Sequence, residues 1–145
     1  MDAATRRAIE WDIERLGIAY AKHIDFGEYE PVASMFLPDG ELSLMGNVFH
    51  GPQEVLAFLE ARPRDRVTQH VLSNCWIKVL DDKQAEGITY LTLYRYQADR
   101  DHPPLPVPLE TPALVGYYTD RYALVDGAWR FARRALTIQY QRAEG

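Results

Sequence analysis

The chain has 145 residues, of which 47% are hydrophobic and 26% are charged, and its formal net charge is −5. These values predict one compact domain over residues 1–145, because a single core commonly covers roughly 100 to 200 residues. The acidic balance argues against a nucleic-acid partner, since phosphate binding needs a basic surface. No apolar run approaches the ~20 residues of a membrane span, and the charged N-terminus does not resemble a secretory leader. We therefore expect a cytoplasmic protein with no membrane partner.

The residues that commonly bind metals or cofactors are sparse. A single cysteine, Cys75, excludes an internal disulfide and every multi-cysteine metal motif. The four histidines have neither HxxxH nor HxH spacing and no acidic cluster beside them, so we expect no metal site. No glycine-rich phosphate loop follows a predicted strand, and the G-x-S-x-G nucleophile motif is missing. The sequence therefore predicts a protein that uses no cofactor.

Three helices are predicted in the first part of the chain. The first covers residues 4–24, where apolar residues recur at spacings of four, three, four and four and form one stripe: Ile9, Ile13, Leu16, Tyr20 and Ile24. Pro31 suits the first turn of a second, short helix over residues 31–37, which would stop at Pro38. A third helix is expected over residues 52–62, ending before Pro63.

The rest of the chain predicts strands and one long loop. Strands are expected at residues 41–49, 67–80, 85–98, 113–125 and 128–141, the first with a turn or bulge at Gly46-Asn47. Asp126-Gly127 between the last two is a strong hairpin signal. The loop 99–112 is rich in proline and is expected to be extended, as a lid, an interface or a disordered tip. Helices followed by antiparallel strands indicate the α+β class, with a pocket between the two layers.

The order of these elements resembles the SnoaL-like branch of the nuclear transport factor 2-like superfamily. The resemblance covers nearly the whole chain and rests on the segments IDFGEYEPVASMFLPDGEL, GPQEVLAFL, QHVLSN and DGAWRFARR. It implies a cone-shaped α+β barrel, in which three N-terminal helices pack on a curved, mostly antiparallel sheet. Members of this superfamily include enzymes, transport factors and accessory subunits of ring-hydroxylating dioxygenases.

One group of residues carries a functional resemblance. An Asp just past the first helix occurs together with a His four residues before an Asn, here Asp25, His70 and Asn74. This pattern resembles the His–Asp dyad of hexachlorocyclohexane dehydrochlorinase, scytalone dehydratase and bile acid 7α-dehydratase. Tyr20, five residues before Asp25, matches a Tyr of the bile acid enzyme, and Arg134 falls near the C-terminal Arg of the dehydrochlorinase. The dehydrochlorinase's N-terminal Lys and the bile acid enzyme's mid-sheet acidic residue have no clear counterpart.

The chemistry implied is an elimination. Histidine suits a general base because its unperturbed pKa of ~6.5 lies near working pH, so His70 would remove a proton. Asp25 would orient the ring, and Tyr20 would donate a hydrogen bond to the leaving group or a developing enolate. Each residue also has a plain structural interpretation: a packed strand His, a turn Asp and a core Tyr.

Several further residues are candidates for binding substrate. Strict alternation would place Asn74 and Trp76 on the face of His70, and Tyr90 and Tyr94 share a face of the next strand. Such an aromatic-lined cavity would favour a small hydrophobic, ring-containing substrate. Alternatively, these rings fill the barrel or a subunit interface.

Arg134 would bind an anionic group or support the pocket wall. Counting by twos from Trp129 places Arg133, not Arg134, on the inner face, so a β-bulge is needed to turn Arg134 inward. We favour Arg134.

The preferred hypothesis is therefore a cofactor-independent lyase, such as a dehydratase. An isomerase of the ketosteroid isomerase type would need the same base, and a binding or accessory subunit would need no dyad. A sheet covered on one face favours a homo-oligomer, and the dyad-bearing relatives favour a trimer over a dimer.

Overall fold

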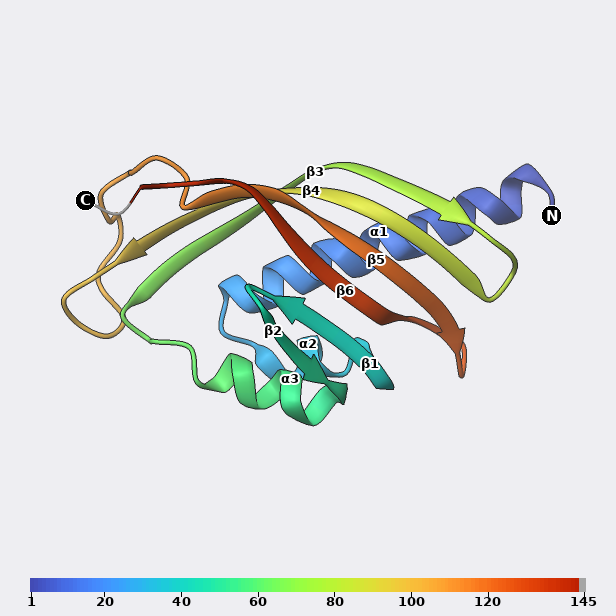
Figure 1. Cartoon of the computed structure of the whole chain (residues 1–145), viewed down its shortest axis with the longest axis horizontal. Helices are drawn as coiled ribbons and strands as arrows, with labels where there is room; N and C mark the ends of the chain where they lie inside the picture. Colours follow the sequence, from blue (N-terminus) through green and yellow to red (C-terminus); the bar gives the residue numbers. More distant parts are fainter. Residues whose placement is uncertain (144–145) are drawn as a thin grey trace.

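A computed structural model describes residues 1–143 and confirms the α+β class: three helices lie against a curved sheet of six strands (Figure 1). The elements in chain order are α1 (Ala3–Asp25), α2 (Tyr29–Ala33), β1 (Phe36–Leu44), β2 (Asn47–His50), α3 (Gly51–Glu60), β3 (Arg66–Val79), β4 (Gln84–Gln97), β5 (Leu114–Val125) and β6 (Ala128–Gln141). The strand order is β2-β1-β6-β5-β4-β3. Among the strand pairs within residues 1–143, β1 and β6 run parallel and the others antiparallel.

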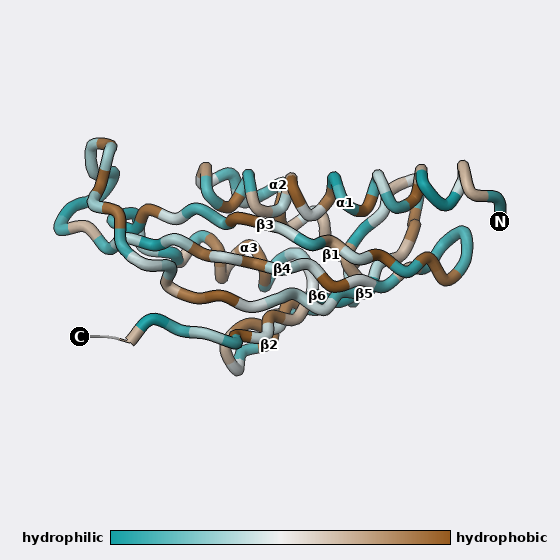
Figure 2. Tube along the Cα trace, turned by 90° about the horizontal axis from the view of Figure 1, so that it is seen from above, coloured by the Kyte–Doolittle hydropathy of each residue, from teal (hydrophilic) through white to brown (hydrophobic). Residues whose placement is uncertain are grey.

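Helix α1 runs along the inner face of the sheet and packs chiefly against β3 (Figure 1). The Asp2 side chain accepts a hydrogen bond from the Thr5 backbone N–H at 2.7 Å and so caps the start of the helix. Hydrophobic and hydrophilic residues alternate along α1 (Figure 2), as expected for a helix with one buried face. The predicted stripe is that face, because Ile9, Ile13, Tyr20 and Ile24 are buried.

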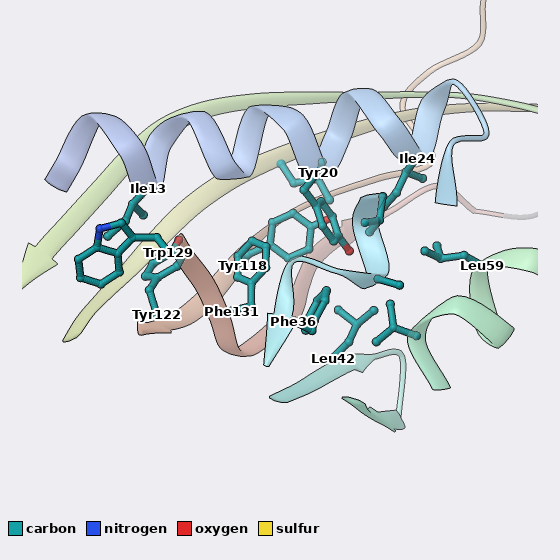
Figure 3. Close-up of a cluster of buried hydrophobic side chains, with 14 of the residues drawn as sticks. Ile13, Tyr20, Ile24, Phe36, Leu42, Leu59, Tyr118, Tyr122, Trp129 and Phe131 are labelled. Atoms are coloured by element: carbon teal, nitrogen blue, oxygen red, sulfur yellow. The ribbon is translucent and has the colours of Figure 1, made fainter. Parts of the chain in front are cut away.

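The core between the helix and the sheet is rich in aromatic rings (Figure 3). Tyr20 from α1 meets Phe36, Tyr118 and Phe131 with ring centroids 5.7–6.5 Å apart, mostly edge to face. Burying one large apolar side chain contributes roughly 1.5–3 kcal/mol. These contacts therefore help to hold α1 against the sheet.

The second predicted helix was too long. Helix α2 ends at Ala33, and Phe36 already begins β1, which runs through Pro38 and Gly40. Phe36 is fully buried and pairs with Phe131 of β6. Pairing across a parallel strand brings together residues far apart in the sequence, and no local signal predicts it.

Residues 41–49, predicted as a strand with a turn or bulge at Gly46-Asn47, belong to a hairpin of β1 and β2. Leu44 pairs with Asn47, which leaves a two-residue turn of Met45 and Gly46. Both turn residues have positive φ, 48° and 83° respectively. This is the conformation that tight hairpins favour and that glycine adopts without strain.

The proline-rich segment between β4 and β5 has no regular secondary structure, as predicted. Two backbone hydrogen bonds attach its first part to the segment before β3: Ala98 donates to the Asp65 carbonyl at 2.8 Å, and His102 to the Arg64 carbonyl at 3.0 Å. The segment therefore lies beside the start of β3.

Candidate active site

The last residue of α1 and the first half of β3 meet at the predicted dyad. Asp25 Oδ1 lies 2.6 Å from Nδ1 of His70, and each side chain is only 11% exposed. The stripe that buries α1 also directs its final turn toward β3, which places Asp25 opposite His70. The sequence prediction that these two residues meet is supported by this contact.

Two further donors hold the Asp25 carboxylate. The backbone N–H of His70 donates to Oδ2 at 2.8 Å, and the Thr68 hydroxyl donates to Oδ1 at 3.1 Å. The Thr68 hydroxyl in turn accepts a hydrogen bond from Nη2 of Arg62 at 3.1 Å. Arg62 also donates through Nη1 to the Ile24 carbonyl and to the Tyr29 hydroxyl. Asp25 is thus held in one orientation from several sides.

This arrangement selects one tautomer of His70. An ionised carboxylate can only accept hydrogen bonds, so the neutral ring carries its proton on Nδ1. Nε2 then has a free lone pair, and no residue within 1–143 forms a hydrogen bond with it. A base needs such an available nitrogen.

His70 lines a cavity of about 250 Å³ between the helices and the inner face of the sheet. Most of its lining is apolar, with Ile24, Phe58, Leu91, Leu93, Leu114 and Leu136 among its walls. The polar groups in the lining include His70, Thr68, Tyr20, Tyr118 and three arginines. A mostly apolar cavity with a few polar groups is typical of small-molecule sites.

Asp25 and His70 also border a wider, more open groove of about 1040 Å³. This groove lies against the C-terminal half of α1, β3 and the proline-rich segment, where Leu105 and Val107 line it. We take the smaller cavity as the candidate active site because it brings His70 together with the buried Tyr20 and Tyr118 and is less open to solvent.

Tyr20 and Tyr118 both line the cavity and are buried. Burial raises the pKa of Tyr20, and it raises the pKa of Tyr118 well above the ordinary value. Both hydroxyls therefore stay protonated over the physiological pH range and can act as hydrogen-bond donors.

Arg134 faces inward, as predicted, and the β-bulge that this requires is present. Tyr122 pairs with Phe131 and Arg121 with Arg133, which leaves Ala132 as the extra residue in β6. Arg134 is fully buried and forms a bidentate ion pair with Asp120, with both N···O distances 2.9 Å. The neighbouring Arg133 instead contacts Glu41.

Aromatic rings surround the Arg134 guanidinium, with its central carbon 4.4, 3.8 and 4.4 Å from the centroids of Tyr20, Tyr118 and Phe131. Burial disfavours its charge, but Asp120 outweighs this effect and raises the pKa of Arg134. Nη1 is buried without a hydrogen-bond partner among the described residues. Arg134 is not among the residues that line the cavity of His70, so the geometry makes it a support beneath Tyr20 and Tyr118.

Comparison with known proteins agrees with this architecture. The family model described as "SnoaL-like domain" matches residues 5–135. The chain belongs to the SnoaL-like family. No curated protein matches the sequence.

Solved structures share the fold at low identity. A protein from Novosphingobium aromaticivorans, provisionally named a scytalone dehydratase, is 25% identical, with a TM-score of 0.81 over 99% of this chain and 93% of that one. A protein of unknown function from Mycobacterium tuberculosis is 24% identical, with a TM-score of 0.80 over 96% and 77%. A hexachlorocyclohexane dehydrochlorinase from Novosphingobium barchaimii is 18% identical, with a TM-score of 0.78 over 97% and 93%.

Two predicted pocket residues of this SnoaL-like chain do not face the cavity. A bulge at Asn74, whose φ is 44°, separates the pairs Ser73–Tyr90 and Cys75–Thr89. It reverses the alternation of β3, so Trp76 lies on the outer face and is 58% exposed. The expectation that Asn74 and Trp76 share the face of His70 was wrong, because strict alternation ends at a bulge.

Tyr90 and Tyr94 share one face of β4, as the alternation predicts, but it is the outer face. Tyr90 is 50% exposed, whereas Leu91 and Leu93 between and beside them are buried and line the cavity. Neither tyrosine lines the smaller cavity. The expectation that Tyr90 shares a cavity with His70 was therefore wrong, whereas Tyr94 borders the wider groove that Asp25 and His70 also border. A homo-oligomer formed through this aromatic outer face stays a prediction.

The sequence reasoning missed Thr68, Arg62, Tyr118 and Asp120. Thr68 lies two residues before His70 and therefore on its strand face, a signal that was available. The positions of Arg62 after α3 and of Asp120 opposite Arg134 depend on strand pairing and had no local signal.

Within residues 1–143, no cluster of three or more His, Cys, Asp or Glu side chains has an arrangement that would hold a metal ion. No helix in that range is both long and apolar enough to cross a membrane.

Proposed function

We propose that this protein is a cofactor-independent lyase that eliminates a small leaving group, such as water or halide, from a small, mostly apolar substrate. The observation that carries the proposal is the 2.6 Å contact between Asp25 Oδ1 and His70 Nδ1 beside a mostly apolar cavity of about 250 Å³. A base with a carboxylate orienter inside a largely apolar cavity suits proton abstraction.

The proposed reaction begins when Nε2 of His70 removes a proton from a substrate carbon. The C–H electron pair forms the new C=C bond, and the leaving group departs with its own bonding pair. Asp25 stabilises the imidazolium that forms, and a tyrosine hydroxyl in the cavity donates a hydrogen bond to the departing atom. His70 then releases its proton to the leaving group or to water, which regenerates the base.

The relatives support this reaction class. Two of the proteins with the same fold bear the names of elimination enzymes, a dehydratase and a dehydrochlorinase. Their identities of 25% and 18% establish a shared fold and leave the substrate open.

A binding or assembly role is the second candidate. The exposed outer face of the sheet favours it, because Trp76 and Tyr90 on neighbouring strands form an aromatic surface there. Such surfaces commonly mark protein contacts. A role of this kind would not need the ordered hydrogen bonds around Asp25.

The first experiment is a screen of small cyclic alcohols, halides and unsaturated ketones in D₂O, followed by NMR and mass spectrometry. Loss of water or halide identifies a lyase, whereas deuterium uptake without loss of a group identifies an isomerase. For the active compound, His70→Gln should lower kcat by about 10²–10⁴-fold, the usual contribution of a general base. His102→Gln, in the exposed proline-rich segment, is the control and should keep full activity. Turnover by His70→Gln at the rate of the unmodified protein would rule out the proposed role of His70.

A further inference from the structure

Three arginines lie at one end of the cavity that His70 lines: Arg62, Arg66 and Arg95. Arg66 is on β3 and shares its inner face with Thr68 and His70, since these positions alternate along the strand. Arg95 on β4 pairs with Thr68, so it is a diagonal neighbour of Arg66 on the same face. Two positive charges thus lie side by side on the inner face of the sheet.

These arginines differ in their partners. Arg62 donates to the Ile24 carbonyl, the Tyr29 hydroxyl and the Thr68 hydroxyl, so its guanidinium supports the dyad. Among residues 1–143, the guanidinium groups of Arg66 and Arg95 form no ion pair and no hydrogen bond, and Nε of Arg66 is buried without a partner. Asp65, the adjacent carboxylate, forms no ion pair with either.

The positive charges of these arginines repel one another. Burial, followed by repulsion from Arg95 and Arg62, lowers the pKa of Arg66, while Asp65 opposes the change. Two neighbouring guanidinium groups without an ion-pair partner, in a partly buried position, present free N–H donors and positive charge to an anion.

We infer that Arg66 and Arg95 bind a carboxylate group of the substrate at this end of the cavity. Carboxylate oxygens match the fork of N–H donors of a guanidinium, and two arginines can bind both oxygens. The inference names the class of substrate that reaches His70, a small carboxylic acid with an apolar body. It rests on the proposed function for the reaction that this substrate undergoes.

The geometry limits the size of that acid. Thr68, the residue opposite Arg95, is two residues from His70, a spacing of about 7 Å along a strand. One small substrate can therefore span the strand positions of the arginines and of His70. The cavity of about 250 Å³ is smaller than the roughly 300–1,000 Å³ of ordinary ligand pockets, which favours a single ring or a short branched chain.

The test measures binding to the whole chain without relying on activity. Benzoate and cyclohexanecarboxylate are titrated by calorimetry and thermal shift, with benzamide and cyclohexanecarboxamide as uncharged counterparts. The carboxylates should bind and raise Tm, and the amides should not. Arg66→Gln and Arg95→Gln should each weaken carboxylate binding by about 10- to 100-fold, as loss of a charged hydrogen bond does. Arg64→Gln, an exposed neighbour, is the matched control and should bind as the unmodified protein does.

A second readout separates a binding role from a structural one. Removing one of two repelling charges should leave the Tm of the empty protein unchanged or higher, while the increase in Tm on adding carboxylate is lost. Arg95→Lys, which keeps the charge, should recover part of the affinity. Equal binding of acid and amide, or unchanged carboxylate affinity in both glutamine variants, overturns the inference.

The same ligands distinguish this inference from the proposed function. His70→Gln should still bind carboxylates, because His70 is not part of the anion site. If carboxylates bind through Arg66 and Arg95 but His70→Gln does not impair turnover of the active compound found in the screen, the proposed function fails and the anion site stands. If His70→Gln abolishes turnover of a neutral compound and carboxylates do not bind, the anion site fails and the lyase stands.

Discussion

Asp25 accepts hydrogen bonds from three donors of different kinds: a ring N–H, a backbone N–H and a hydroxyl. The backbone N–H of His70 is always a donor, whereas the imidazole ring can move its proton from one nitrogen to the other when its partner at position 25 changes. The tautomer of His70, and with it the free nitrogen that can act as a base, therefore depends on both oxygens of Asp25 being acceptors.

Asp25→Asn tests this dependence. The asparagine oxygen should face the backbone N–H of His70, which places its NH₂ group against Nδ1 and moves the ring proton to Nε2. Nitrogen chemical shifts from ¹⁵N NMR should show this change of tautomer with the fold retained. An analogous Asp-to-Asn change that imposes the wrong tautomer costs about 10⁴-fold in kcat, and a large loss is expected here. An Nδ1–H tautomer in the variant would contradict the proposed hydrogen-bond pattern.

At the scale of elements, the β5–β6 pair holds the aromatic side of the cavity. Asp120 and Arg134 lie directly opposite each other, and the Tyr122 hydroxyl donates to Asp120 at 2.8 Å. The bulge at Ala132 makes this pairing possible because it shifts the alternation of β6 by one residue. The guanidinium then supports the rings of Tyr20 and Tyr118, which line the cavity.

Asp120→Ala should destabilise the fold by about 3–5 kcal/mol, because it leaves a buried guanidinium without its counter-charge. Denaturant unfolding followed by circular dichroism measures this loss. The double variant Asp120→Ala/Arg134→Met should recover much of it, since apolar replacement of a whole buried pair is often nearly neutral. A double variant as unstable as the sum of both single variants would show that the pair is not coupled.

At the scale of the whole molecule, three tyrosines of the core link stability to pH. Burial raises the pKa of Tyr20, Tyr118 and Tyr122 in the folded chain above the value of ~10 for an exposed tyrosine. Since the folded state holds these protons more tightly, their effect on stability is fully favourable below about pH 10 and is lost as pH rises further.

An alkaline titration should therefore show two classes among the nine tyrosines. Absorbance at 295 nm should report a late class that ionises together with the loss of near-ultraviolet circular dichroism. Tyr122→Phe should remove one tyrosine from that late class. Ionisation of all nine in one step near pH 10, with near-ultraviolet circular dichroism retained, would contradict the burial of these three.

The sequence by itself determined the features that depend on local periodicity. The spacing of Ile9, Ile13, Tyr20 and Ile24 identified α1 and its buried face, and the alternation in β4 identified Tyr90 and Tyr94 as sharing one side. The resemblance to the family identified Asp25 and His70 as candidate catalytic residues, and the structure shows that their side chains are in contact. Short-range patterns sufficed here because helices and strands repeat over a few residues.

Only the tertiary structure decided which side of each strand faces the cavity. Alternation shows which residues share a face but not which face a helix covers, so Tyr90 was placed on the wrong side. The bulges at Asn74 and Ala132 each shift a strand by one residue, which moved Trp76 outward and Arg134 inward. The approach of Arg66 and Arg95 follows from the register of β3 on β4. Strand pairing joins residues distant in the chain, and no local pattern in the sequence records it.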